Sequence, residues 1–249
     1  MNFFESRGEI LDIKKILKEN FTAKKLTFLA IFWVLALISQ RINFSAVLGA
    51  DNQFFTLFQF FAPIAGIFLG PVFGILAVLL AEIGNFVLNA MPWTVLNMLR
   101  LVPILFATYY FGTRNGSWQK RFSILIPVLA MIAFIVHPVG RTVWFFTIFW
   151  TIPIIAVILP KKYGGKSVFL KSLGSTMTAY VVGTALWIWT VPMTAGQWIA
   201  LIPIVAYERL LFAAGIGVTF FVFNTVFAML DEKWTSDAIF IDKNKVLVK

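Results

Sequence analysis

The 249-residue chain contains no cysteine and a single histidine. Without cysteine, the chain can form no disulfide, no thiolate nucleophile and no cysteine-ligated metal site. One histidine is too few for a convincing zinc site. The chain also lacks a nucleotide-binding loop, so any ATP hydrolysis must come from another protein. We therefore predict no metal site and no other cofactor.

Charged residues are also scarce, at 13% of the chain, whereas 60% of the residues are hydrophobic and 28 are phenylalanine. A soluble domain with so few polar side chains could not cover its own surface, so the composition indicates a polytopic membrane protein. The formal net charge of +10 would suggest nucleic acid as a partner of a soluble protein. Here the basic residues fall between apolar runs, which is typical of topology signals. We expect a lipid bilayer around the protein and no nucleic acid.

Eight apolar segments follow one another, divided by short polar or Gly- and Pro-containing stretches. They run approximately over residues 26–44, 54–69, 71–89, 95–111, 122–136, 143–159, 173–190 and 203–230. Residues 1–25 mix apolar and lysine side chains, as in an amphipathic segment on a membrane surface. Residues 231–249 form a charged tail. We interpret residues 26–230 as one transmembrane domain, an all-α helical bundle of six to eight transmembrane segments.

The basic residues also predict the orientation of the chain. Most of them precede the first segment, lie near residues 117 and 165, or belong to the tail. The alternate loops hold only Arg141, with Arg41 at the end of the first segment. Since positively charged loops stay in the cytoplasm, we expect a multi-pass protein of the cell membrane with both termini cytoplasmic, and residues 1–25 and 231–249 on that side.

Residues 49–89 contain two apolar arms with no polar linker between them. Pro71 lacks a backbone donor and disfavours helical geometry at the residue before it. One helix is therefore expected to end at Gly70 and the next to begin at Pro71. The first arm, residues 54–69, would be only about 24 Å long and is interrupted by Pro63, whereas the hydrocarbon core is roughly 30 Å thick. A short broken helix of this kind suggests a site within the bilayer.

The strongly polar residues inside the apolar segments all map to the outer half of the bilayer in this topology. They are Glu82, Asn85, Asn97, Arg100, Glu208 and Arg209. A lone charge in hydrocarbon is costly, so these groups should pair with each other or face a wet cavity. Ion pairs of Glu82 with Arg100, or of Glu208 with an arginine, could serve only to fix helix register. A register device has no reason to prefer one leaflet, so the placement favours a polar pocket open to the outside.

Tryptophan residues share this bias toward the outside. Most are expected to form an interfacial belt, although Trp93 or Trp187 could stack on a flat ligand. Gly66, Gly70 and Gly74 are spaced by four, which lets helices approach closely. Internal packing is the simpler interpretation of these glycines, and docking onto a partner membrane protein is the alternative.

Residues 60–89, which read FFAPIAGIFLGPVFGILAVLLAEIGNFVLN, resemble the second and third helices of the substrate-binding S components of energy-coupling factor (ECF) transporters. In that family a run ending in GPxxG precedes a helix with an acidic or polar residue near its outer end. The matching residues are Gly70, Pro71, Gly74 and Glu82. The last segment, IVAYERLLFAAGIGVTFFVFN, is similar to the family's final helix, which also starts with a charged pair. The similarity covers about residues 26–112 and 172–230.

The resemblance implies a helical bundle that captures a vitamin or related micronutrient from outside, under the loop between its first two segments. It also implies a transmembrane coupling subunit and two cytoplasmic ATPase subunits as partners, which drive release as the bundle topples in the membrane. Two features depart from the family. Its members usually have six helices, so residues 122–160 are interpreted as an inserted hairpin. Their first helix usually docks the coupling subunit through two alanines four residues apart, whereas Ala30 and Ala36 are six apart.

Our leading hypothesis is a substrate-binding subunit without catalytic chemistry of its own. The predicted binding residues are Asp51, Asn52, Glu82, Asn85, Trp93, Asn97, Arg100, Trp187, Glu208 and Arg209. Two hypotheses from other classes stay open at this point. Glu82, Glu208 and His137 could activate water in an intramembrane hydrolase or lipid-modifying enzyme. Alternatively, the chain could be a structural subunit of a larger membrane complex.

Overall fold

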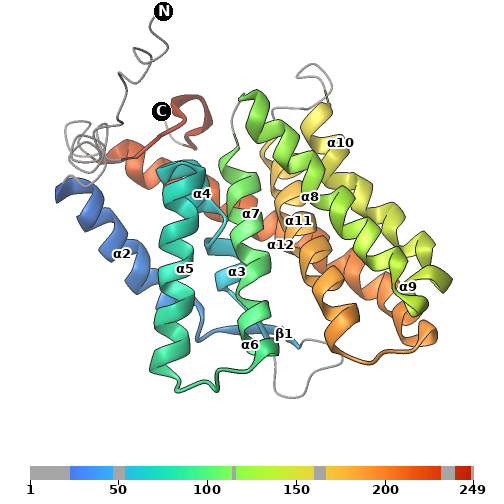
Figure 1. The fold of residues 1–249 in the computed structure, drawn as a ribbon. Coiled ribbons are helices and arrows are strands. Elements are labelled where there is room, and N and C mark those ends of the chain that lie inside the picture. Colours follow the sequence, from blue (N-terminus) through green and yellow to red (C-terminus); the bar gives the residue numbers. More distant parts are fainter. Residues whose placement is uncertain (1–22, 47–53, 114–115, 160–166, 231–238, 248–249) are drawn as a thin grey trace, which may run out of the picture.

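The computed structural model describes residues 23–46, 54–113, 116–159, 167–230 and 239–247. Within these residues the protein is a bundle of helices with one short pair of strands (Figure 1). The elements are α2 (Ala23–Ser39), β1 (Asn43–Ala46), β2 (Phe54–Thr56), α3 (Phe58–Phe61), α4 (Ile64–Leu69), α5 (Pro71–Leu88), α6 (Val95–Arg100), α7 (Val102–Gly112), α8 (Ser117–Val136), α9 (Pro138–Thr142), η1 (Trp144–Thr151), α10 (Ile152–Ile158), α11 (Val168–Thr190), α12 (Ala195–Met229) and η3 (Lys243–Lys245). Most of the predicted segment 1–25 and residues 231–238 of the tail lie outside the described residues.

Four helical runs among the described residues are long and apolar enough to cross a membrane. They are α5, α6 with α7, α8 and α12. Shorter apolar helices lie at residues 25–39, 58–69 and 144–158. Helix α11 lies centrally and packs against α7, α8, α10 and α12. The expected all-α polytopic fold is confirmed.

The junction of the two arms in residues 49–89 is also confirmed. Helix α4 ends at Leu69 and α5 begins at Pro71. Gly70 between them has a φ of +83°, a conformation that residues with a Cβ rarely adopt. A turn of this kind needs no polar linker, because one glycine reverses the chain.

The residues before this turn differ from the expectation of two plain apolar segments. Helix α2 ends at Ser39 instead of reaching residue 44, and β1 then pairs with β2 in an antiparallel ribbon. The arm 54–69 is a strand followed by two short helices, broken at Pro63. Proline has no N–H for a helical hydrogen bond, which accounts for that break.

Helix α12 begins earlier than predicted, at Ala195 instead of residue 203. Thr194 accepts a hydrogen bond from the backbone N–H of Gln197, and the Gln197 side chain accepts one from the backbone N–H of Thr194. This reciprocal capping starts the helix in a stretch that was expected to be a loop. Pro203 lies inside the helix, which continues to Met229.

Three glycines bring α4, α5 and α7 into backbone contact. A Cβ on Gly74 would lie 2.6 Å from the Cα atom of Gly66, and a Cβ on Gly112 would lie 2.5 Å from the carbonyl oxygen of Gly66. A Cβ on Gly66 would overlap the carbonyl oxygen of Thr108. Internal packing therefore accounts for Gly66 and Gly74.

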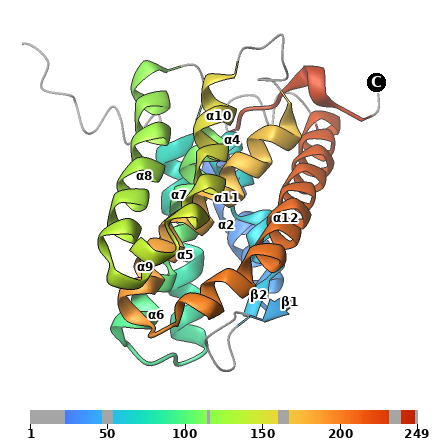
Figure 2. The ribbon, with the colours of Figure 1, turned by 90° about the vertical axis from the view of Figure 1, so that its right-hand side faces the viewer.

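The buried side chains form two cores. The first joins α2, α3, α4, α5, α7 and α12, with Phe32, Phe61 and Phe220 among its members. The second joins α8, η1, α11 and α12 around Phe134, Trp150 and the neighbouring aromatic rings. Figure 2 shows α8, α9 and α10 on the outer side of α11. Within the segment 122–160, which we interpreted as an inserted hairpin, the described residues 122–159 thus form an aromatic core with α11 and α12.

Residues 239–247 return to the bundle and pack against it, at the end that also holds the α4–α5 turn (Figure 1). The backbone N–H of Phe240 donates to the carbonyl oxygen of Phe68 at 2.8 Å. Asn224 of α12 is fully buried, and its amide donates to the carbonyl oxygens of Asp242 and Lys245. Its Oδ1 atom accepts from the backbone N–H of Asp242 at 2.9 Å. We call residues 239–247 the C-terminal clasp.

Candidate substrate-binding site

A cavity of about 570 Å³ lies at the end of the bundle opposite the C-terminal clasp. Its wall is built by the two residues that follow α2, the β1–β2 ribbon, α3, α5, α6, the start of α7, α11 and α12. Among the described residues, α8, α9, η1 and α10 contribute nothing to that wall. The volume is typical of sites for small organic ligands.

Seven of the predicted binding residues line this cavity. They are Glu82, Asn85, Asn97, Arg100, Trp187, Glu208 and Arg209. Asp51 and Asn52 lie outside the described residues. Trp93 does not line the cavity; it is 64% exposed and packs on Phe86, which does, with ring centroids 4.5 Å apart.

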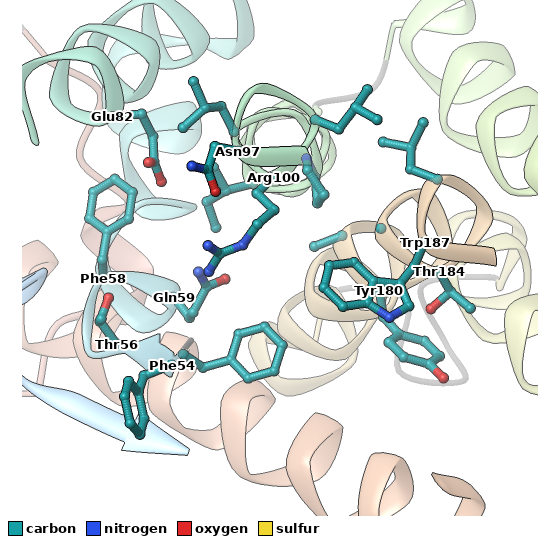
Figure 3. A pocket seen from close by; sticks show the side chains of 18 of the residues that line it. Phe54, Thr56, Phe58, Gln59, Glu82, Asn97, Arg100, Tyr180, Thr184 and Trp187 are labelled. Carbon is teal, nitrogen blue, oxygen red and sulfur yellow. The ribbon is translucent and has the colours of Figure 1, made fainter. Parts of the chain in front are cut away.

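Glu82 and Arg100 come from different helices and point into the cavity (Figure 3). Both are partly buried. Their opposite charges attract one another, but the two groups do not reach ion-pair distance. Within the described residues, neither side chain forms a hydrogen bond to the protein. The cavity wall therefore contains one acidic and one basic side chain, and each can still form hydrogen bonds to a ligand.

Glu208 and Arg209 are engaged with the protein itself. Their side chains form an ion pair at 3.2 Å, and Glu208 also accepts a 2.6 Å hydrogen bond from the Ser45 hydroxyl on β1. The guanidinium of Arg209 lies 4.4 Å from the ring centroid of Phe212 and 5.3 Å from that of Phe55 on β2. The pair thus joins the ribbon to α12.

The asparagines form a polar rim. The Asn89 amide donates to Asn85 Oδ1 at 2.6 Å, and Arg41 Nη1 donates to Asn89 Oδ1 at 2.8 Å. Asn97 is tied to the α5–α6 loop, because its amide donates to the carbonyl oxygen of Pro92 at 3.0 Å. Thr94 caps α6 by accepting from the backbone N–H of Asn97.

Several lining residues were not predicted from the sequence, among them Gln40, Gln59, Tyr180 and Thr184. Gln59 is the one amide side chain in the apolar run FFTLFQFFAP, a signal like the one that identified Glu82, so it could have been found. Tyr180, Thr184 and Trp187 recur at spacings of four and three, which places them on one face of α11. Figure 3 shows this face across the cavity from Glu82 and Arg100.

The residues of the hydrolase hypothesis are not brought together. His137 caps α9, since its Nδ1 accepts from the backbone N–H of Val139, and its ring packs on Trp189. It is not among the residues that line the cavity with Glu82 and Glu208. The described residues hold no group of three histidine, aspartate or glutamate side chains that could bind a metal ion.

The N-terminal half of the chain is similar in sequence to a known family of membrane proteins. A family model described as ECF transporter, substrate-specific component, matches residues 24–136, which include Glu82, Asn97 and Arg100. A protein of Methanocaldococcus jannaschii that carries the description uncharacterized protein is 24% identical over 228 residues, which cover 86% of this chain and 74% of the relative. No solved structure matched the chain. The family match and the helical bundle agree with the resemblance seen in the sequence: residues 24–136 of this chain are similar to the substrate-specific components of ECF transporters.

Proposed function

We propose that the protein captures a vitamin or related micronutrient from outside the cell and holds it in the 570 Å³ cavity. The observation that carries this proposal is the presence of both Glu82 and Arg100 in the cavity wall, each partly exposed and neither bonded to the described protein. Charges left without a protein partner at the depth of a membrane are costly unless they serve a ligand or a water-filled cavity.

The direction of capture follows from the charges at the two ends of the bundle. Lys120 and Arg121 lie at the start of α8, and Lys243 and Lys245 belong to the C-terminal clasp, at the end away from the cavity. The positive-inside rule assigns that end to the cytoplasm. The cavity then faces outward, and both termini are cytoplasmic.

The β1–β2 ribbon is proposed as part of the cap over the substrate. Asn43, Phe54 and Thr56 of the ribbon line the cavity, and Ser45 holds β1 to Glu208 of α12. The loop between the strands carries Asp51 and Asn52, which we propose as further binding residues.

Release is proposed to depend on partners of the kind that the family uses, a transmembrane coupling subunit and two cytoplasmic ATPases. The alanine pair that usually docks the coupling subunit has no close counterpart here. Ala36 is fully buried inside the bundle, so it cannot contact a partner, whereas Ala30 is exposed. We propose that α2 contacts the coupling subunit through a different set of residues, and that residues 122–160 are an addition to a six-helix core.

Native mass spectrometry of the purified protein tests the proposed function. A small organic molecule is expected to co-purify, and Glu82→Ala and Arg100→Ala should each weaken its binding about tenfold or more, because a charge-assisted hydrogen bond is lost. Arg141→Ala is the matched control, since Arg141 is exposed at the same end but does not line the cavity. Unchanged affinity in both cavity variants would remove this cavity as the binding site.

A further inference from the structure

We infer that the cavity accepts an amphoteric ring compound, a small molecule that carries a cationic group, an anionic group and a flat ring. The inference rests on the proposed function and adds the chemical class of the substrate. It follows from the charges that the cavity wall leaves unpaired and from where the wall presents aromatic surface.

Among the described residues, the charged side chains of the wall are Arg41, Glu82, Arg100, Glu208 and Arg209. Glu208 and Arg209 neutralise each other at 3.2 Å. Arg41 is exposed at the rim and donates to Asn89. Of these five described side chains, one acid, Glu82, and one base, Arg100, are therefore left for a ligand.

Glu82 and Arg100 are separate sites, because they do not form an ion pair with each other. A ligand with an amine and an acidic group can satisfy both at once. A ligand with one charge would leave the other side chain facing a cavity without its partner, and such a mismatch is strongly rejected. Gln59 lies beside Arg100 in Figure 3 and adds neutral hydrogen-bonding capacity there.

Aromatic surface lies on the far side of the cavity. Trp187 and Tyr180 of α11 face Glu82 and Arg100 across the space (Figure 3). The face of Tyr180 is partly taken by the Arg209 guanidinium, 5.2 Å from its ring centroid. Trp187 is the partly exposed ring that a flat ligand can stack on.

The second aromatic core holds this wall in place from behind. Trp198 lines the cavity and packs on Phe134 and Phe146, with ring centroids 5.4 Å and 5.6 Å away. Trp187 packs against the same core. The ring side of the cavity is thus fixed at a set distance from the charged side, which favours an elongated ligand with its ring at one end and its charges at the other.

Three probes built on one ring system test this inference. L-tryptophan carries both charges, tryptamine only the cation and indolepropionate only the anion. Binding to the purified protein in lipid nanodiscs is measured by titration calorimetry. L-tryptophan is expected to bind about tenfold to a hundredfold more tightly than either single-charge probe, the difference expected when one charged group loses its partner.

Variants that remove one charge identify which wall residue binds the amine of the probe and which binds its carboxylate. In Glu82→Gln the advantage of L-tryptophan over indolepropionate should disappear, and in Arg100→Gln its advantage over tryptamine should disappear. Trp187→Ala should weaken all three probes by a similar factor, because it removes the ring contact. Arg141→Gln, outside the cavity, should leave the three affinities unchanged.

The remaining outcomes separate the substrate class from the proposed function. Equal affinity for the three probes, or an unchanged preference in both charge variants, overturns the inference. If no probe binds, the co-purified molecule decides: a molecule with a ring and both charges supports the inference, and one that lacks either overturns it while the proposed function stands. If no probe binds and nothing co-purifies, the proposed function fails as well.

Discussion

At the scale of single residues, two glutamates in one cavity have different roles. Glu82 forms no bond to the described protein, whereas Glu208 is bonded to both Arg209 and Ser45. The sequence predicted both as ligand-binding groups, since both are acids in apolar segments at similar depth. Only the contacts made by neighbouring elements distinguish them, and the β1–β2 ribbon that supplies Ser45 was not predicted.

Glu208→Ala is expected to lower stability and not only affinity. It would leave Arg209, a residue that is only 4% exposed, without its counter-ion, a change that typically costs about 3–5 kcal/mol. Thermal unfolding of the purified protein measures the loss. The neighbouring Tyr207 is 68% exposed, so Tyr207→Ala is the control. Equal melting temperatures for the two variants would contradict this account.

The glycine contact gives a second prediction at this scale. Gly74→Ala and Gly112→Ala place a methyl group against the backbone of Gly66, so each should destabilise the protein by about 1–3 kcal/mol. At Gly196 the nearest atom to a new Cβ is Thr194 Oγ1, 4.0 Å away. Gly196→Ala should therefore melt like the parent protein. A loss at Gly196 as large as that at Gly74 would show that helix packing is not the cause.

At the scale of elements, the sequence predicted which segments are helical better than it predicted the residues at which the helices begin and end. The Gly70–Pro71 turn was predicted because proline and glycine act locally on the backbone. The ribbon was missed because its strands, NFSA and FFT, are short and adjoin apolar runs. The position of these strands depends on residues far along the chain, such as Glu208, which bonds to Ser45. No pattern within the strand sequences themselves predicts such a contact.

The C-terminal clasp is also an element that the sequence did not predict. A lysine-rich tail is expected to lie in solvent and not to pack against the bundle. Asn224→Leu keeps the branched shape of the side chain but removes three hydrogen bonds to the clasp backbone. The amide of Asp242 should then exchange with deuterium much faster, while α12 keeps its protection. Val222→Ala, at an exposed position of the same helix, is the control. Unchanged exchange in Asn224→Leu would show that Asn224 does not hold the clasp.

At the scale of the whole molecule, the positive-inside rule and the positions of polar residues predicted a pocket at one end of the bundle. The structure brings seven of those residues around one cavity. The α11 wall was only partly anticipated, through Trp187, because Tyr180 and Thr184 lie in a helix that carries hydroxyl side chains along most of its length. Such residues can be recognised as cavity-lining only once the structure places α11 opposite α5 and α6.

The orientation can be tested because the chain has no cysteine, so an introduced thiol is unique. Gly196→Cys lies at the cavity end and Ser117→Cys at the opposite end, and both positions are exposed. In intact cells a membrane-impermeant maleimide should label Gly196→Cys, and should label Ser117→Cys only after permeabilisation. The reverse pattern would invert the orientation and place the cavity toward the cytoplasm.

The contact among Gly66, Gly74 and Gly112 bears on how tightly a ligand can bind. Backbones that touch without intervening side chains have no rotamers to rearrange, so α4, α5 and α7 are locked together. Glu82 belongs to α5, and Arg100 lies two residues before α7. The separation of the backbone positions that carry the two charges is therefore set before a ligand arrives. A ligand that matches it does not have to order the helices that carry these charges, and this preorganisation lowers the entropic cost of binding.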